Sequence, residues 1–208
     1  MNSDRLLSPL FNIPLGLLIV CLTVSAYAGT EHAVDQAKQK NEYETSAREL
    51  RKSAEAGDAS AQNALGLLYY KGKGIPQNYG QAKEWFEKAA KQGRAGAQVN
   101  LGTLYLHGDG PPQSAHMALF WFERAAAQGD ALAFAKLGRM YERGRGVSQD
   151  FIQAQMWYTL SAAHGEQRAA EARDALAKQM TPAQIAESER LAREWRPKAK
   201  QSPAPSRF

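Results

Sequence analysis

Three stretches of the sequence repeat one another at a fixed spacing of 36 residues. They read GLLYYKGKGIPQNYGQAKEWF (66–86), GTLYLHGDGPPQSAHMALFWF (102–122) and GRMYERGRGVSQDFIQAQMWY (138–158). The spacing does not slip, and a fixed period of about 20 to 50 residues is the signature of a solenoid or another repeat architecture. This repeat constrains the fold more than any other feature and predicts one supersecondary unit used three times.

Each unit reads as two helices joined by a turn. In the first unit, apolar residues recur at helical spacing in DASAQNALGLLYYKG and again in YGQAKEWFEKAAKQG. Between them, the glycines of KGKG supply the positive φ values with which a helix ends and the chain reverses. Asn78 stands where the second helix needs an N-cap, and Ser114 and Asp150 take that position in the later units.

A glycine recurs in the middle of each first helix, at Gly66, Gly102 and Gly138. Glycine in a helix interior costs about 1 kcal/mol relative to alanine. Its return at the same position therefore indicates that two helix backbones approach closely there. We expect Trp85 or Phe86 of the second helix, and their equivalents in later units, to cover this position.

The pattern A-x-x-x-L-G-x-x-Y-x-x-G-x-G, followed by a capped helix with A-x-x-W-[FY]-x-x-A-A, resembles the Sel-like repeat family. These proteins are bacterial and eukaryotic relatives of tetratricopeptide repeats. The resemblance covers three units, 58–93, 94–129 and 130–165, and implies an all-α fold: a right-handed α-solenoid of helix-turn-helix repeats with about nine helices. Family members are typically adaptors that gather partners into complexes, including periplasmic and envelope proteins.

The sequence on both sides of the three units predicts capping helices. One period before the first unit, Glu49 replaces the tryptophan, as expected of a terminal helix with one face in water. Residues 29–57 are therefore assigned to an N-terminal capping helix. Residues 166–196 predict a closing pair of helices, the second of which begins with the N-cap, proline and capping box of TPAQ. We expect Leu191 and Trp195 to dock that last helix.

The first 28 residues read as a secretory signal peptide. A charged start precedes the apolar run IPLGLLIVCLTV, and Ala26-Tyr27-Ala28 fits the small-x-small pattern of a cleavage site. We expect cleavage after Ala28 and export to the periplasm, and an uncleaved anchor is the alternative. Cleavage removes Cys21, the only cysteine, which leaves no disulfide and no thiolate metal ligand.

Positive charge gathers at the C-terminal end of the chain. The formal net charge is +5, and from Arg190 onward six basic residues face one acidic residue. The rest of the chain is near neutral, whereas nucleic-acid binders usually spread lysine and arginine along a folded face. We therefore expect no nucleic-acid partner. Residues 197–208 read as a basic disordered tail, and membrane contact is expected only through the uncleaved signal peptide or weakly through this tail.

No pattern for catalysis or cofactor binding is recognisable in the sequence. It contains no G-x-S-x-G, P-loop or dinucleotide fingerprint. The histidines His32, His107, His116 and His164 lack the spacing of a metal site. Trp85, Trp121 and Trp157 share helical spacing with alanines, which favours a core role over a ligand-stacking row. We expect no enzyme, no catalytic residue, no cofactor and no metal.

The first helices carry the positions that the repeat leaves free to vary. In tetratricopeptide relatives these helices line a concave groove, and the resemblance implies the same here. We predict that the groove is apolar in the first two units and charged in the third, and that it binds a protein or peptide of the cell envelope. The predicted contact residues are Asn63, Leu67, Tyr70, Lys71, Val99, Thr103, Leu106, His107, Arg139, Glu142 and Arg143, with Tyr70 foremost.

Two alternatives stand beside this hypothesis of an exported interaction scaffold. Leu67 and Leu106 could be half-buried against the neighbouring unit and bind nothing. The protein could also be a cell-envelope hydrolase of the Sel-like type, although the paired cysteines of that group are missing, or a structural envelope component tethered by its basic tail.

Overall fold

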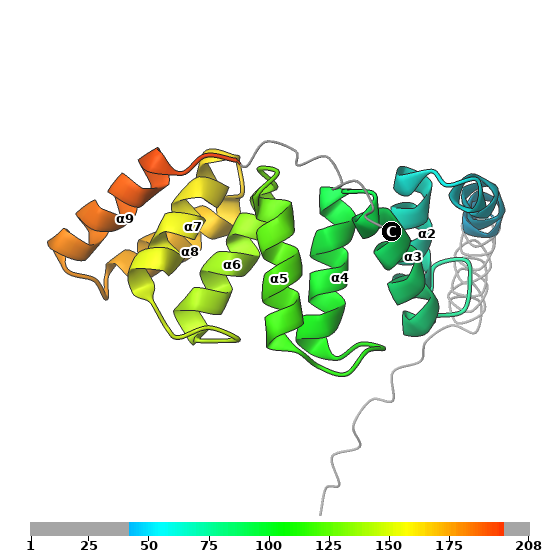
Figure 1. Ribbon diagram of the computed structural model, residues 1–208, viewed down its shortest axis with the longest axis horizontal. Coiled ribbons are helices and arrows are strands. Elements are labelled where there is room, and N and C mark those ends of the chain that lie inside the picture. The colour runs from blue at the N-terminus through cyan, green and yellow to red at the C-terminus, as the bar shows by residue number, and fades with distance from the viewer. Residues whose placement is uncertain (1–41, 198–208) are drawn as a thin grey trace, which may run out of the picture.

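The structure is a computed structural model that describes residues 42–197, and every element within this range is a helix. A helical segment over residues 42–55 is followed by α2 (Ala59–Lys71), α3 (Tyr79–Lys91), α4 (Ala95–His107), α5 (Ala115–Ala126), α6 (Ala131–Arg143), α7 (Phe151–Ala163), α8 (Gln167–Ala177) and α9 (Pro182–Glu194). Figure 1 shows the helices following one another along the longest axis, from α2 near one end to α9 at the other. The predicted all-α fold is confirmed. The predicted signal peptide, the first part of the N-terminal capping helix and the tail from residue 198 lie outside the described residues.

The helix ends are set by the capping residues that the sequence predicts. The side chains of Asn78, Ser114 and Asp150 accept hydrogen bonds from backbone N–H groups in the first turns of α3, α5 and α7. The first helices α2, α4 and α6 end at glycines in the left-handed conformation, for example Gly108 with φ of 79°. Since an L side chain is strained there, this glycine lets the chain turn into the next helix. The N-terminus of α4 differs, because Arg94 provides no capping side chain.

The glycine inside each first helix lies against an aromatic ring of the second helix, as predicted. A Cβ atom at Gly102 would lie 2.6 Å from Cε1 of Phe122, and one at Gly66 would lie equally close to Phe86. Phe86 and Phe122 are both fully buried. Of the two candidate aromatic positions, the ring beside the tryptophan therefore covers the glycine.

The tryptophans of the second helices belong to the core rather than to a ligand-binding row. Trp85 is only 8% exposed, and Trp121 and Trp157 are half-buried against neighbouring hydrophobic clusters. Their indole N–H groups are buried without a hydrogen-bond partner in the described structure. These rings therefore stabilise the fold through buried area and not through hydrogen bonds.

The C-terminal helices α8 and α9 both pack against α7. Trp195 lies with its ring centroid 4.9 Å from that of Phe134 and 6.0 Å from that of Trp157. Leu191 packs against the same cluster. The predicted docking role of Leu191 and Trp195 is confirmed, and α9 begins with the predicted capping box at Thr181.

Candidate partner-binding face

Four positions recur on one side of each first helix, at the spacing i, i+4, i+7 and i+11, and are exposed or half-buried in all three units. Residues with this spacing lie on one face of an α-helix. They form the first-helix stripe: Ser60, Ala64, Leu67 and Lys71 on α2, Gly96, Asn100, Thr103 and His107 on α4, and Leu132, Lys136, Arg139 and Arg143 on α6.

The predicted contact residues divide into two groups in the structure. The first group belongs to the first-helix stripe and consists of Leu67, Lys71, Thr103, His107, Arg139 and Arg143. The second group lies toward the seams between helices and consists of Asn63, Tyr70, Val99, Leu106 and Glu142.

Val99 and Leu106 are not available to a partner. They are 2% and 7% exposed and belong to one hydrophobic cluster with residues of α5 and α6, including Leu137. Because α4 is the middle first helix, other helices cover both of its sides. This corrects the prediction for these two residues and supports the alternative that Leu106 packs against the neighbouring unit, whereas Leu67 is half-buried against the cluster of α3 and α4.

Asn63 and Tyr70 connect the first unit to the second. The Asn100 side-chain amide donates a hydrogen bond to Asn63 Oδ1 at 2.9 Å. The Tyr70 hydroxyl donates to Asp109 Oδ2 at 3.3 Å, and its ring lies 5.5 Å from that of Tyr79. Burial, together with the nearby Asp109 carboxylate, raises the pKa of Tyr70. These contacts give Tyr70 a structural role, while a role in partner binding stays a prediction.

Glu142 also makes a contact within the protein. Its carboxylate accepts a hydrogen bond from the Tyr158 hydroxyl at 2.6 Å. Burial is the main cause that raises the pKa of Tyr158, and this hydrogen bond adds to it. Glu142 is therefore engaged with α7, and it forms no ion pair with the cations of the stripe on its own helix among the described residues.

The stripe on α6 combines three cations, of which Lys136 is not among the predicted contact residues. Lys136 is half-buried, and its pKa is lowered by burial and by the neighbouring Arg139. Asn100, the equivalent of Lys136 on α4, is not among the predicted contact residues either. The i, i+4, i+7, i+11 spacing counted from Ser60 is the signal that finds both residues.

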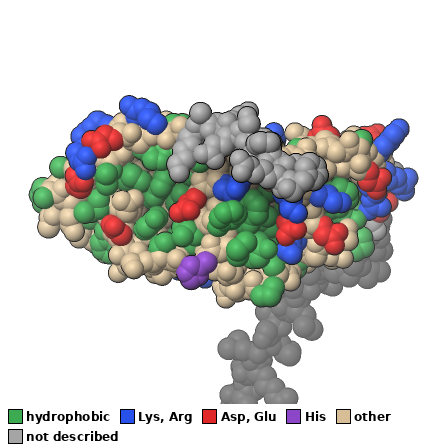
Figure 2. Space-filling view, viewed as in Figure 1, with side chains coloured by type: hydrophobic (Ala, Val, Ile, Leu, Met, Phe, Trp, Pro, Cys, Tyr) green, Lys and Arg blue, Asp and Glu red, His purple; other side chains and the backbone are tan. Residues whose placement is uncertain are grey.

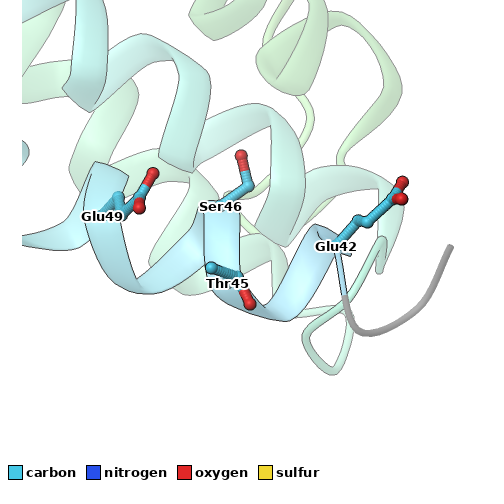
Figure 3. Close-up of a pocket in the computed structure, with 4 residues that line it drawn as sticks. All are labelled: Glu42, Thr45, Ser46 and Glu49. Carbon is cyan, nitrogen blue, oxygen red and sulfur yellow. The ribbon is translucent and has the colours of Figure 1, made fainter. Parts of the chain in front are cut away.

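The described residues do not form a recognisable metal site. In residues 42–197 no three His, Cys, Asp or Glu side chains gather closely enough to hold a metal ion. Figure 3 shows a depression lined by Glu42, Thr45, Ser46 and Glu49, all from the helical segment 42–55. The lining combines two carboxylates with two hydroxyl groups and contains no histidine, lysine or cysteine, so these residues do not form a Ser–His or Ser–Lys arrangement.

Surface composition also differs along the molecule. On the face seen in Figure 2, hydrophobic side chains gather over the middle, and charged side chains are more frequent toward both ends. Large hydrophobic side chains that are exposed include Phe120 on α5 and Leu132 at the start of α6. Every helix in residues 42–197 is too short or too polar to cross a membrane.

The fold and the free first-helix face define an α-helical repeat solenoid. The chain belongs to the Sel1 repeat family, which matches residues 59–93, 95–130 and 131–166. Proteins with these repeats are generally non-enzymatic scaffolds, and the repeats typically mediate protein–protein interactions. The predicted membership and the predicted solenoid are therefore confirmed.

The crystal structures that are similar to this chain include two proteins with this fold. One is a protective antigen present in uropathogenic Escherichia coli strains that displays an SLR fold, with a TM-score of 0.66 and 36% identity over 70% of this chain and 31% of the antigen. The other is a Sel1 repeat protein from Oxalobacter formigenes, with a TM-score of 0.58 and 37% identity over 68% of this chain and 55% of that protein. The chain thus spans about a third and about half of the two proteins. A search of curated proteins found no match.

Proposed function

We propose that the protein is an exported scaffold that holds a segment of a partner protein against its first helices. The observation that supports this function is the contrast between the repeat frame and the first-helix stripe. Frame residues such as Gly66 and Phe86 return in register, whereas one stripe position holds Leu67, Thr103 and Arg139 in successive units. Surface positions that change while the frame stays constant are where a repeat protein gains its binding specificity.

Binding on this face requires little rearrangement of the scaffold. Successive units share continuous hydrophobic clusters and are also tied by side-chain hydrogen bonds, such as the one from Asn100 to Asn63. A surface that is formed before the partner arrives loses less conformational entropy on binding. The proposed mechanism is passive: a rigid row of first helices lines a groove and positions a partner segment.

Export rests on the signal-peptide pattern of residues 1–28. In a Gram-negative host, expression of the full-length sequence should give a periplasmic product that begins at residue 29. Fractionation followed by N-terminal sequencing tests this directly. A product that stays in the membrane fraction with its first residues intact would support the uncleaved anchor instead.

The binding function is tested by an affinity pull-down from envelope extract with protein expressed from the full-length sequence. The stripe variant combines Lys71→Glu, Thr103→Arg and Arg139→Glu. The control variant combines Lys52→Glu, Ser53→Arg and Lys91→Glu, which makes the same net change of charge at exposed positions outside the stripe. Circular dichroism first establishes that both are folded.

We expect partners that the wild type and the control variant retain and the stripe variant loses. Retention of the same partners by all three proteins would place binding on another surface. If the wild type retains nothing beyond an unmodified resin, the scaffold function is refuted.

A further inference from the structure

The stripe on α6 has a chemical character that the stripes on α2 and α4 lack. It begins with Leu132, which is 45% exposed, and continues through Lys136, Arg139 and Arg143. At 1.5 Å per residue these four positions extend over about 16 Å of helix. The surface is therefore one apolar contact followed by three cations on a single helix face.

None of these three cations has a hydrogen-bond or ion-pair partner among the residues that the structure describes. Other basic residues do find partners: Lys83 pairs with Glu87 at 3.2 Å, and Arg190 binds both Glu187 and Glu194. The nearest acidic residue in sequence, Glu142, accepts the hydroxyl hydrogen bond of Tyr158. The three cations of the α6 stripe therefore make no direct ion pair within residues 42–197, and their hydrogen-bonding groups are available to a ligand.

Lys136 lacks a hydrogen-bond partner among the described residues because the residue that would face it differs between the repeat units. In the first seam, Asn100 donates to Asn63. One period later, the equivalent positions hold Lys136 and Val99. The valine side chain offers no acceptor, so the half-buried Lys136 lacks the hydrogen bond between units that Asn100 makes. Burial and Arg139 both lower the pKa of Lys136, so an approaching carboxylate would offset an unfavourable environment.

We propose that the α6 stripe binds an acidic segment of the partner protein, with carboxylates at Lys136, Arg139 and Arg143 and an apolar side chain against Leu132. The proposal rests on the proposed scaffold function and names the partner's chemistry. Arginine favours carboxylates through two parallel hydrogen bonds, which makes Arg139 and Arg143 suited to this ligand. An extended peptide rises about 3.3 Å per residue, so a segment of about five residues matches the length of the stripe.

Charge complementarity identifies the ligand as an acidic segment rather than an apolar one. Matched charges mainly fix orientation and raise the association rate, and the interaction weakens as salt screens it. Because Leu132 lies at one end of the stripe, it would fix the orientation in which the acidic segment binds. We expect a bound sequence with an apolar residue at one end and two or three Asp or Glu residues after it.

The experiment selects ligands from a displayed library of random dodecapeptides on immobilised protein expressed from the full-length sequence. The test variant is Lys136→Gln/Arg139→Gln/Arg143→Gln. The control variant, Arg48→Gln/Lys52→Gln/Lys91→Gln, removes the same charge at exposed positions outside the first helices that likewise have no partner among the described residues. Selected peptides are then synthesised and titrated against all three proteins by fluorescence anisotropy.

We expect the wild type to select peptides enriched in Asp and Glu. The test variant should bind them about tenfold or more weakly, and the control variant within about twofold of the wild type. Raising NaCl from about 0.05 M to 0.3 M should weaken wild-type binding and change that of the test variant little.

Selected peptides without acidic enrichment, or equal binding by the two Gln variants, would overturn this proposal and leave the scaffold function intact. If the library gives no binder, the test variant is compared with the wild type on a partner from the envelope pull-down. Unchanged retention of that partner overturns the acidic-segment proposal alone, whereas the lack of any partner refutes the scaffold function itself.

Discussion

Replacement of Gly102 by alanine tests whether close helix approach explains the recurring glycine. On helix propensity alone, Gly102→Ala in the middle of α4 should stabilise the protein by about 1 kcal/mol. The structure predicts the opposite sign, because the new Cβ would lie 2.6 Å from Phe122 Cε1 and 3.2 Å from the carbonyl oxygen of Ala118. Carbon atoms in contact normally lie about 3.5–4.0 Å apart, so the ring must move by about 1 Å.

The magnitude follows from the surroundings of Phe122. This ring is fully buried, so its displacement disturbs a packed core rather than solvent. Overpacking of this kind costs about 1–3 kcal/mol. Part of that cost is offset by the gain in propensity, and we expect a net loss of about 1–2 kcal/mol for Gly102→Ala.

Urea unfolding followed by circular dichroism measures this change. The matched control is Gly96→Ala in the same helix, where the nearest atom to the new Cβ, Asn63 Nδ2, lies 3.9 Å away. This control should be neutral or slightly stabilising. The double variant Gly102→Ala/Phe122→Leu should lose less stability than the two single losses added together, since the smaller side chain makes room for the methyl group. A Gly102→Ala protein as stable as Gly96→Ala would refute the reasoning.

Three further predictions use the same unfolding assay. Trp195→Ala removes a half-buried ring 4.9 Å from Phe134 and should cost about 2–3 kcal/mol, with faster amide exchange in α9. Tyr158→Phe removes the hydrogen bond to Glu142 and should cost about 1 kcal/mol near neutral pH. Since the pKa of Tyr158 is raised on folding, the folded protein keeps this proton after the unfolded chain releases it, and stability falls as pH rises above about 10. The variant should show a smaller fall between about pH 9 and pH 11. Arg94→Asp should add the missing N-cap of α4 and stabilise the protein by about 0.5–1 kcal/mol.

Each of these predictions has a clear contradicting result. An unchanged urea midpoint for Trp195→Ala would mean that the ring does not dock α9. If stability fell equally with pH in the wild type and in Tyr158→Phe, the raised pKa of Tyr158 would not contribute to the pH dependence of stability. Arg94→Asp must also be compared with Arg94→Ala, and equal stability of the two would show that the new carboxylate does not cap the helix.

The helices and their order could be predicted from the sequence because the same local signals recur in every unit. Capping residues, helix-ending glycines and apolar spacing are all local, and three copies remove the ambiguity of one. The choice between Trp85 and Phe86 as the cover of Gly66 could not be made in this way. It depends on how far one helix is rotated about its axis relative to the other, and both aromatic positions satisfy the same apolar period.

The exposed face of the first helices was predicted only in part, and helix geometry explains why two of the predicted residues are buried. Successive residues turn by about 100° around a helix. Counted from Ser60, positions 64, 67 and 71 stay within about 40° of the starting direction, whereas positions 63 and 70 lie about 60–80° to one side. The predicted set included 63 and 70, and their equivalents Val99 and Leu106 therefore fall in the buried seam.

The third unit lacks a pair of hydrogen-bonded glutamines that the first two units share, and contacts within the protein explain this difference. In the first unit Gln92 donates a hydrogen bond to Gln62 at 2.7 Å, and the same pair recurs one period later. The third unit replaces this pair with Phe134 and His164, whose rings lie 5.5 Å apart. Trp195 packs against Phe134, so the polar pair has become an apolar surface that α9 covers. This substitution allows the C-terminal helix to pack against the last repeat unit and cover its end.

The same unit departs from the pattern a second time, on the first-helix face. The hydrogen-bonded pair of Asn63 and Asn100 becomes Val99 and Lys136, and the half-buried Lys136 side chain forms no hydrogen bond or ion pair among the described residues. The replacement of the glutamine pair is accompanied by the contact between Phe134 and Trp195. The replacement of the asparagine pair leaves Lys136 half-buried without a hydrogen bond or ion pair among the described residues. An unpaired half-buried charge reduces stability unless something binds it. Packing of α9 and Trp195 explains why Phe134 replaces a glutamine. A carboxylate supplied by the proposed partner would explain Lys136 in the same way.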